Sequence, residues 1–335
     1  PSPTPPAKKF FLMIRRPPRS TLRLTRRQRQ MCIRDSGKVA VIEMAEASGL
    51  PMVPVELRNP MKTTTYGTGQ LILDAVKKGV KKIIVGIGGS ATSDAGLGML
   101  QALGFACLDA KGKEVAHGGD GLVQLAKIIK PLIEDGEFLF KDRDIVVACD
   151  VNSPLYGEHG SAYVYGPQKG ADREMVGVLD GGLRNFAKVV EESLGEDVHT
   201  LAGGGAAGGL GACLHAALGG KLKPGFEIIR DQVKLDFLLE GVDLVITAEG
   251  QMNHQSLKGK LPVELSKLGK VYGAKSVVIT GSRDIELKEV SEFNVIGVFP
   301  IAKGPMSLEE SMQKGKTLIE DTLLNVLTTI HGIGC

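Results

Sequence analysis

Apolar residues recur along the chain in two spacings, one typical of helices and one typical of buried strands. Residues 68–78 carry apolar residues at positions 71, 72, 75 and 76, which is the spacing of one helix face. Gly79 follows as a helix C-cap would. Residues 82–87 are a largely β-branched run without a polar face, as in a strand covered on both sides. A glycine loop at 88–94 comes next, so the pattern predicts strand, loop and helix in succession.

The same two patterns alternate through the rest of the chain. Further strands are predicted at residues 39–43, 144–149, 243–247, 276–280 and 294–299. Further helices are predicted near 95–103, at 174–193, after the glycines within 203–218, at 261–268 and at 307–330. Ser307 and Glu310 fit a capping box at the start of the last helix. Helices that alternate with strands indicate a parallel sheet, so the predicted fold class is α/β.

Composition agrees with an α/β enzyme. The chain has 335 residues, 43% hydrophobic and 24% charged, which is enough for two globular domains. Only 4% of the residues are aromatic, whereas 44 are glycine. A glycine-rich, aromatic-poor chain suits an enzyme with many ligand loops better than a β-sandwich or a protein that stacks nucleobases.

The basic charge is concentrated in the first 36 residues, which hold ten Lys and Arg residues and one acidic residue, Asp35. The formal net charge of +3 therefore leaves 31 basic and 37 acidic residues, a net charge of −6, for residues 37–335. This acidic body argues against nucleic acid or an anionic membrane as a partner. The first segment lacks an initial Met, has prolines at 17 and 18, and resembles translated adapter sequence. We expect it to be foreign and disordered.

The cysteines and apolar runs indicate the compartment. Five cysteines are widely spaced without a CxxC pair, which is typical of a reducing cytoplasm and not of a disulfide framework or a zinc site. No apolar run approaches the roughly 18 residues that a membrane-spanning helix needs. We therefore expect a cytoplasmic protein.

The glycine loop after the strand at 82–87 is the first candidate site. Gly88 and Gly89 allow backbone N–H groups to approach an anion, and the next helix N-terminus adds a favourable dipole. Ser90 and Thr92 can donate hydrogen bonds. Asp94 can hold a metal ion or a substrate hydroxyl, or it can simply cap the next helix.

Other candidates follow predicted strands or occupy polar loops. Asp150 comes after the strand at 144–149, where ligand sites of α/β sheets concentrate, although an aspartate there is equally consistent with a turn. In GPQKG, Gln168 is polar and Lys169 can reach a phosphate or a carboxylate. Gly205 and Gly208 belong to a G-x-G-x-x-G match, which indicates either a phosphate cradle or tight helix packing.

A last group follows the strand at 243–247. Glu249 lies two residues after the predicted strand, and Gln255 and Ser256 follow in a polar loop. Lys260 begins the next predicted helix, where it can neutralise phosphoryl charge. The sequence contains no P-loop, no protein-kinase H-R-D or D-F-G signature and no HExxH zinc motif.

The order of these motifs resembles the class I glycerate kinase family. The resemblance runs through IEMAEASGL, TTTYGTGQLI, GIGGSATSDAG, VACDVNSPLYG, GPQKGA, GGGAAGGLGA and EGQMNHQSLKGKLP, over about residues 37–335. It implies ATP- and Mg²⁺-dependent phosphorylation of D-glycerate, usually to 2-phosphoglycerate. It also implies two α/β domains, one Rossmann-like and split, and the other inserted into it. We expect the inserted domain at 37–240 and the C-terminal part of the split domain at 241–335.

Two departures from the family pattern bear on activity. The family's opening strand–helix unit, with its own Asp, Ser and Lys residues, does not appear. Where the family reads GEGR-x-D-x-Q, this chain has Gln251 in place of Arg and Asn253 in place of Asp. An amide cannot act as a base and is a poor Mg²⁺ ligand. The alternative to an active kinase is therefore a nucleotide- or glycerate-binding homologue with impaired turnover. A weaker alternative, drawn from GGGAAG, is a nicotinamide-binding oxidoreductase.

Overall fold

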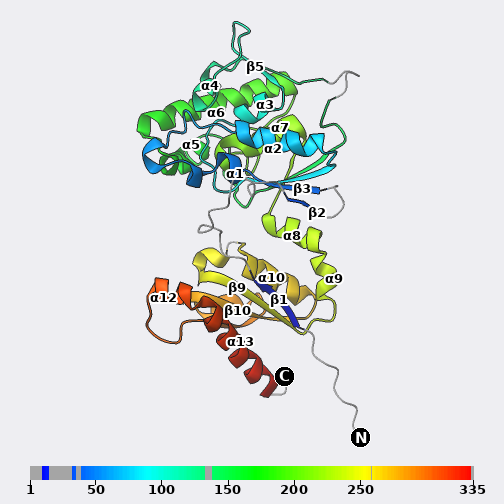
Figure 1. Cartoon of the computed structure of the whole chain (residues 1–335), viewed down its shortest axis with the longest axis vertical. Coiled ribbons are helices and arrows are strands. Elements are labelled where there is room, and N and C mark those ends of the chain that lie inside the picture. Colours follow the sequence, from blue (N-terminus) through cyan, green and yellow to red (C-terminus); the bar gives the residue numbers. More distant parts are fainter. Residues whose placement is uncertain (1–9, 15–31, 35–38, 133–137, 258, 333–335) are drawn as a thin grey trace. The chain divides into compact units, whose positions relative to one another are not determined.

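The chain forms two compact units in a computed structural model that describes residues 10–14, 32–34, 39–132, 138–257 and 259–332 (Figure 1). The glycine-rich unit spans Arg23–Gly225, and the C-terminal unit comprises Pro1–Leu22 and Phe226–Cys335. Both are α/β structures built on largely parallel sheets. The predicted fold class is therefore confirmed, whereas the exact domain boundaries of the sequence analysis stay a prediction.

The glycine-rich unit is built on a five-stranded sheet of order β2-β3-β4-β7-β8. These strands are β2 (Cys32–Arg34), β3 (Val39–Glu43), β4 (Lys82–Gly86), β7 (Asp144–Ala148) and β8 (Lys221–Lys223). All neighbouring pairs are parallel except β2 with β3. A separate antiparallel pair, β5 (Ala106–Leu108) and β6 (Lys127–Ile129), was not predicted, because three residues are too few to show a period.

Helices pack on this sheet through apolar side chains. The α-helices are α1 (Ala45–Ser48), α2 (Tyr66–Lys77), α3 (Leu97–Ala102), α4 (Gly119–Gln124), α5 (Ser161–Tyr165), α6 (Arg173–Leu194) and α7 (Leu210–Leu218). The 3₁₀ turns are η2 (Leu50–Met52), η3 (Val55–Leu57), η4 (Pro167–Lys169) and η5 (Ala206–Gly209). One core joins Ile83 and Val85 of β4 with Ile72 of α2, Phe186 of α6 and Leu214 of α7, all buried. The helices predicted around residues 68–78 and 174–193 are therefore confirmed.

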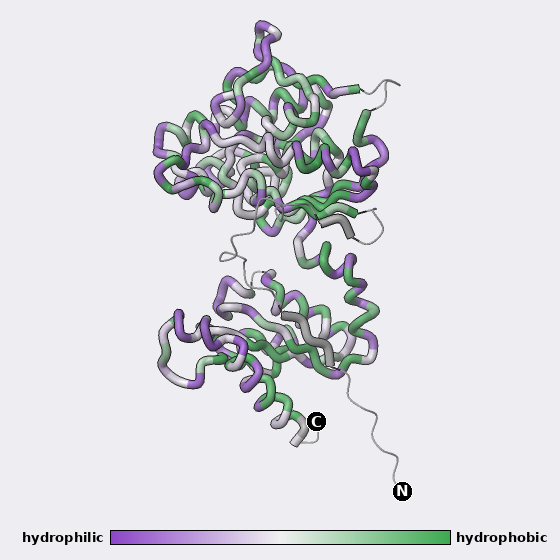
Figure 2. Tube along the Cα trace, viewed as in Figure 1, coloured by the Kyte–Doolittle hydropathy of each residue, from purple (hydrophilic) through white to green (hydrophobic). Residues whose placement is uncertain are grey.

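The C-terminal unit has a four-stranded parallel sheet of order β1-β9-β10-β11. Its strands are β1 (Phe10–Ile14), β9 (Leu244–Asn253), β10 (Lys275–Asp284) and β11 (Val295–Pro300). Its helices are α8 (Gly225–Val233), α9 (Leu235–Leu239), η6 (His254–Leu257), α10 (Leu261–Val271), α11 (Leu287–Ser291), α12 (Leu308–Gln313) and α13 (Gly315–Gly332). Hydrophobic stretches occur in strands and in helices of both units, between more hydrophilic stretches of the trace (Figure 2).

Alternating strand residues bury the two faces of this sheet against different helices. Ile246 of β9 and Val277 of β10 pack with Leu318 of α13. Their neighbours Val245 and Val278 point to the opposite face and join the clusters that contain residues of α10. Such a sheet, covered on both sides, explains why the strands read as continuous apolar runs. The parallel sheet predicted for the last hundred residues is confirmed.

Three sequence predictions need correction. The predicted helix 307–330 is two helices, α12 and α13, although Ser307 does cap the first by accepting a hydrogen bond from the Glu310 N–H at 3.1 Å. The strand predicted at 243–247 continues to Asn253, because β10 pairs with it to its end. Within the segment expected to be disordered, Phe10–Ile14 pairs with β9, whose edge offers free backbone groups to any extended apolar stretch.

The rest of that segment lies outside the described residues. Within the part of the chain that the structure describes, no helix is both long enough and apolar enough to cross a bilayer.

Candidate active site

The carboxyl ends of β4 and β7 meet at a cavity of about 350 Å³ in the glycine-rich unit. The register pairs Gly86 with Ala148, so Gly88 and Asp150, each two residues further on, leave the sheet at the same edge. The cavity is lined by Leu50, Ile87, Gly88, Gly89, Ser90, Ala148, Cys149, Asp150, Val151, Tyr165, Gln168, Lys169, Ala206 and Ala207. Six residues nominated from the sequence are therefore brought together: Gly88, Gly89, Ser90, Asp150, Gln168 and Lys169.

Lys169 is the most deeply buried charged group in this wall. It ends the turn η4, and only 1% of its surface is exposed. The next residue, Gly170, has φ +94, and a Cβ there would lie 2.3 Å from the Arg58 carbonyl oxygen, so glycine is required. The Lys169 ammonium donates to the Thr92 carbonyl at 2.6 Å. Burial lowers the pKa of Lys169 to about 8, and the nearby Asp94 opposes that shift.

Asp94 does not line the cavity. It is fully buried, and its carboxylate accepts hydrogen bonds from the Thr65 N–H at 2.8 Å, the Thr65 hydroxyl at 2.9 Å, and the Gly96 and Gly98 N–H groups at 3.2 and 3.3 Å. Burial raises the pKa of Asp94, and these hydrogen bonds oppose the rise. Because Gly98 lies in the first turn of α3, the carboxylate satisfies a free helix-end donor. The position of Asp94 therefore favours the interpretation that it caps the start of α3 over direct contact with a substrate.

The glycine loop is clamped at its base. The Gly89 carbonyl accepts from the Leu50 N–H at 2.8 Å, and the Ala91 N–H donates to the Ser48 carbonyl at 2.9 Å. Gly89 itself has φ +73, a conformation that favours glycine. These contacts hold Gly88–Ser90 in place at the cavity wall, as a preorganised binding loop requires.

Three other nominated residues pack beside the cavity without lining it. Thr92 is 1% exposed, and it contributes its carbonyl to Lys169. Gly205 donates its N–H to the Ser153 carbonyl, and Gly208 accepts from the Ala95 N–H at 2.9 Å. The glycines of the G-x-G-x-x-G match thus pack closely against the backbone near Ser153 and Ala95. Ala206 and Ala207, which lie between these glycines, line the cavity.

Asp150 is the carboxylate of the cavity. It lies after β7, and its Oδ1 accepts a hydrogen bond from the Gly225 N–H at 2.7 Å. Two of its neighbours in the lining, Cys149 and Tyr165, were not predicted from the sequence. Burial raises the pKa of the Cys149 thiol, and the Tyr165 hydroxyl lies 2.9 Å from the Ser153 hydroxyl. Neither side chain was a candidate by residue type and position, so only strand register and helix placement reveal them.

The remaining nominated residues belong to the C-terminal unit. Glu249 lies within β9 and pairs with Thr280, so it does not follow the strand as predicted. Ser256 is buried in η6, and its hydroxyl accepts from the Asn253 N–H at 3.1 Å. Lys260 immediately precedes α10. Gln255 is exposed, and its N–H donates to the Asn253 side-chain oxygen at 3.0 Å.

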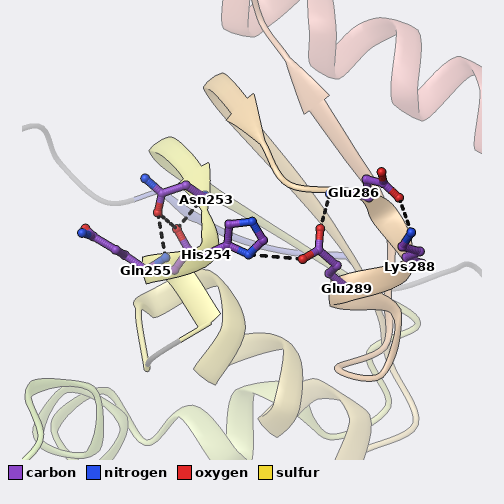
Figure 3. A network of polar contacts seen from close by, with 7 residues as sticks. Asn253, His254, Gln255, Glu286, Lys288 and Glu289 are labelled. Carbon is purple, nitrogen blue, oxygen red and sulfur yellow. Dashed lines mark hydrogen bonds and ion pairs between the residues drawn. The ribbon is translucent and has the colours of Figure 1, made fainter.

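A polar network surrounds this turn (Figure 3). His254 lies against Glu289, with 3.2 Å between Nδ1 and Oε1, and Glu289 accepts from the Glu286 N–H at 2.8 Å. Asn253 organises the turn through its side-chain oxygen, a role that an aspartate would also fill. Among the residues that the structure describes, no three His, Cys, Asp or Glu side chains gather as a metal-binding group.

The chain is similar to known glycerate kinases in both sequence and structure. The family model "Glycerate kinase family" matches residues 20–331. A glycerate kinase from Halalkalibacterium halodurans is 45% identical over 293 residues, which cover 86% of this chain and 75% of that protein. A glycerate 2-kinase from Escherichia coli is 41% identical over 89% of this chain and 77% of its own length. The crystal structure of a glycerate kinase 2 from Salmonella typhimurium LT2 aligns with a TM-score of 0.78 and 42% identity, over 88% of this chain and 76% of that one.

Proposed function

This chain belongs to the glycerate kinase family, and we propose that it transfers the γ-phosphoryl group of ATP to the 2-hydroxyl of D-glycerate. The oxygen of that hydroxyl forms the new bond to phosphorus while the bond to the ADP oxygen breaks, and the hydroxyl proton passes to a base. The products are 2-phosphoglycerate and ADP. The need for ATP favours a cytoplasmic location.

The observation that carries this proposal is the buried Lys169 ammonium in a cavity that also holds the Asp150 carboxylate. Glycerate offers one carboxylate and two hydroxyl groups, so it needs a cation at one end and a hydrogen-bond acceptor near the other. We assign the carboxylate to Lys169 and the glycine loop, with Gln168 as a further polar contact. Asp150 orients the attacking hydroxyl and accepts its proton. Positioning of this kind supplies most of the rate in phosphoryl transfer.

We assign the nucleotide phosphates to the C-terminal unit. Lys260 immediately precedes α10, an eleven-residue helix whose N-terminal N–H groups favour anions. Ser256 and Gln255 lie in the preceding turn η6, and Glu249 lies in the strand that leads to it. Mg²⁺ usually binds in such enzymes through the nucleotide phosphates and only one or two carboxylates, so we expect it to enter together with ATP.

The direct test is ADP release with D-glycerate as acceptor, coupled to NADH oxidation. We expect turnover with D-glycerate, and none with glycerol, which has no carboxylate. Phosphorus NMR of the product distinguishes 2-phosphoglycerate from 3-phosphoglycerate. Turnover with glycerol equal to that with D-glycerate would contradict the assignment of Lys169 to the carboxylate.

Replacement of Asp150 by Asn is expected to lower kcat by about 10²- to 10⁴-fold, because an amide cannot take the hydroxyl proton. The Asn side-chain oxygen can still accept the Gly225 N–H, so the fold should be preserved. Steady-state kinetics with D-glycerate check this. Asp109→Asn, which changes a half-buried carboxylate outside the cavity lining, is the control and should leave kcat unchanged, because the Asn oxygen can still accept from the Lys111 and Lys113 N–H groups. A kcat within threefold of the parent chain in D150N would exclude Asp150 as the base.

The alternative function, ligand binding with impaired turnover, is favoured by Asn253. Its side-chain oxygen already holds the turn before α10, so Asn253→Asp should fold normally and restore the carboxylate of the family pattern. If catalysis needs that carboxylate, kcat should rise by at least about tenfold in the Asp variant. Comparison of kcat for the two proteins, with thermal melting as the folding check, decides the matter. An unchanged kcat would show that Asn253 does not limit turnover.

A further inference from the structure

The ammonium of Lys169 has unused hydrogen-bonding capacity. A lysine ammonium has three donors, and one of them is given to the Thr92 carbonyl. No second acceptor for it lies within hydrogen-bond distance among the described residues. Burying an ammonium with two unsatisfied donors is costly unless an anionic ligand completes the shell. Because Lys169 lines the cavity, we expect a ligand bound there to supply acceptors for the other two N–H donors of the ammonium.

Asp94 lies two residues beyond Thr92, whose carbonyl accepts from this ammonium, and it is fully buried outside the cavity lining. Three of its four hydrogen-bond donors are backbone N–H groups, which cannot turn away from a protonated carboxyl. The fourth, the Thr65 hydroxyl, is itself oriented because it accepts from the Met99 N–H at 2.9 Å. Four convergent donors fit an ionised carboxylate. Asp94 therefore places a negative charge near Lys169, two residues beyond the carbonyl that holds the ammonium.

We propose that Asp94 is a positioning residue that acts through Lys169, holding the ammonium charged at the cavity wall so that its two free donors receive the carboxylate of the acid substrate. This inference rests on the proposed function and deepens it, because it assigns the glycine-rich cavity to glycerate and not to the nucleotide. Without Asp94, desolvation would act unopposed and the pKa of the ammonium would be lower still.

The size and lining of the cavity favour the acid. A volume of about 350 Å³ lies at the lower end of pockets that hold drug-sized ligands, and glycerate has only a few heavy atoms. Tyr165 is the one aromatic residue among the described residues of the lining, so no pair of rings is present there to hold an adenine between them. A compact anion matches a single buried ammonium beside glycine amides.

Other titratable groups surround the ammonium. Asp150, Cys149 and Tyr165 line the same cavity, and Cys213 of α7 lies near Asp94. Burial raises the pKa of both thiols, so they keep their protons at neutral pH. Arg58 contacts the neighbouring Gly170 through its backbone carbonyl. All five side chains are present both in the parent chain and in an Asp94→Asn variant, so a difference between these two proteins is due to Asp94.

The test compares Asp94→Asn with the parent chain over pH 6 to 9, measuring kcat/KM for D-glycerate and, separately, KM for ATP. In the parent, kcat/KM for glycerate should fall as pH rises through about 8. In D94N this fall should move down by about one to two pH units, because an adjacent opposite charge shifts a pKa by roughly that amount. At pH 8 the variant should be about 5- to 50-fold poorer, and at pH 6 it should lie within about threefold of the parent. KM for ATP should change less than twofold.

Thr65→Ser is the matched control, since it removes a buried methyl group beside Asp94 but keeps the hydroxyl that donates to the carboxylate. It should lower the melting temperature and leave the pH profile in place. An equal loss at every pH in D94N, or an equal rise in both KM values, would overturn the proposal in favour of a purely structural role.

If D94N does not fold, calorimetric titration of the parent chain with D-glycerate provides an independent test. Binding should weaken as pH rises through about 8, and pH-independent binding would overturn the inference. Absence of turnover at every pH with retained, pH-dependent glycerate binding would refute the kinase activity and support the inference.

Discussion

Lys169→Met should lower kcat/KM for D-glycerate by about 30- to 5,000-fold, which corresponds to the roughly 2–5 kcal/mol lost when one partner of a buried charged pair is removed. Methionine has a similar length and fills the same space, but it offers no donor to the substrate carboxylate or to the Thr92 carbonyl. The effect should fall mainly on KM for glycerate. KM for ATP should stay within about threefold, because we assign the nucleotide to the other unit.

The control for this substitution is Lys188→Met. Lys188 lies on α6 of the same unit, and 69% of its side chain is exposed. A charge lost there should change neither kinetic constant appreciably, because exposed ion pairs contribute little. Similar kinetics in K169M and K188M would show that Lys169 does not bind the substrate, and the cavity would lose its role in the proposed mechanism.

Gly208→Ala should lower the free energy of unfolding by about 2–5 kcal/mol. Gly208 has φ +74, and a Cβ there would lie 2.0 Å from the Thr92 carbonyl oxygen and 2.6 Å from the Ser93 Cα. Both neighbours are backbone atoms, and the Thr92 carbonyl is held by Lys169, so neither can move cheaply. The substitution should therefore also disturb glycerate binding. Urea unfolding followed by circular dichroism measures the first effect.

Gly112→Ala separates backbone strain from the close contact. Gly112 has φ +76, nearly the same as Gly208, but nothing lies within 4 Å of the position that an alanine Cβ would take there. Gly112→Ala should lower the free energy of unfolding by only about 1–2 kcal/mol, which is the cost of placing alanine in the left-handed conformation. Equal losses of stability in the two variants would show that the loop carrying Thr92 and Ser93 can move to accommodate the added methyl group. That result would contradict the hypothesis that Thr92 holds Lys169 rigidly.

Local structure was predictable where a segment is long and strongly periodic. The strands β3 and β7 and the helices α2 and α6 were found within one or two residues, because side-chain spacing reports directly on backbone period. The end of β9 was not found. Glu249 and Gly250 look like a loop by composition, yet the paired strand β10 continues beside them to Asn253. Pairing between distant segments overrode local preference there.

The candidate site was predictable as a set of residue types but not as a place. Gly88 and Asp150 follow strands, and ligand sites concentrate at such strand ends, so both could be nominated. Asp94 was nominated on the same grounds, although it is buried away from the cavity. Its neighbour Ser90, four residues earlier, does line the cavity. The path of the loop in three dimensions, which no spacing rule describes, separates the two.

Sequence alone determined the α/β order of elements, the family and the chemical character of the loops, because these depend on which residues stand near one another along the chain. Tertiary structure alone decided that Lys169 meets the carbonyl of Thr92 across 77 positions of sequence, and that Asp94 is buried where its charge acts on that lysine. Burial and charge coupling arise only once strand register and turn geometry bring distant segments together. The protonation of the lysine, and with it the proposed recognition of the acid, therefore depends on the folded chain.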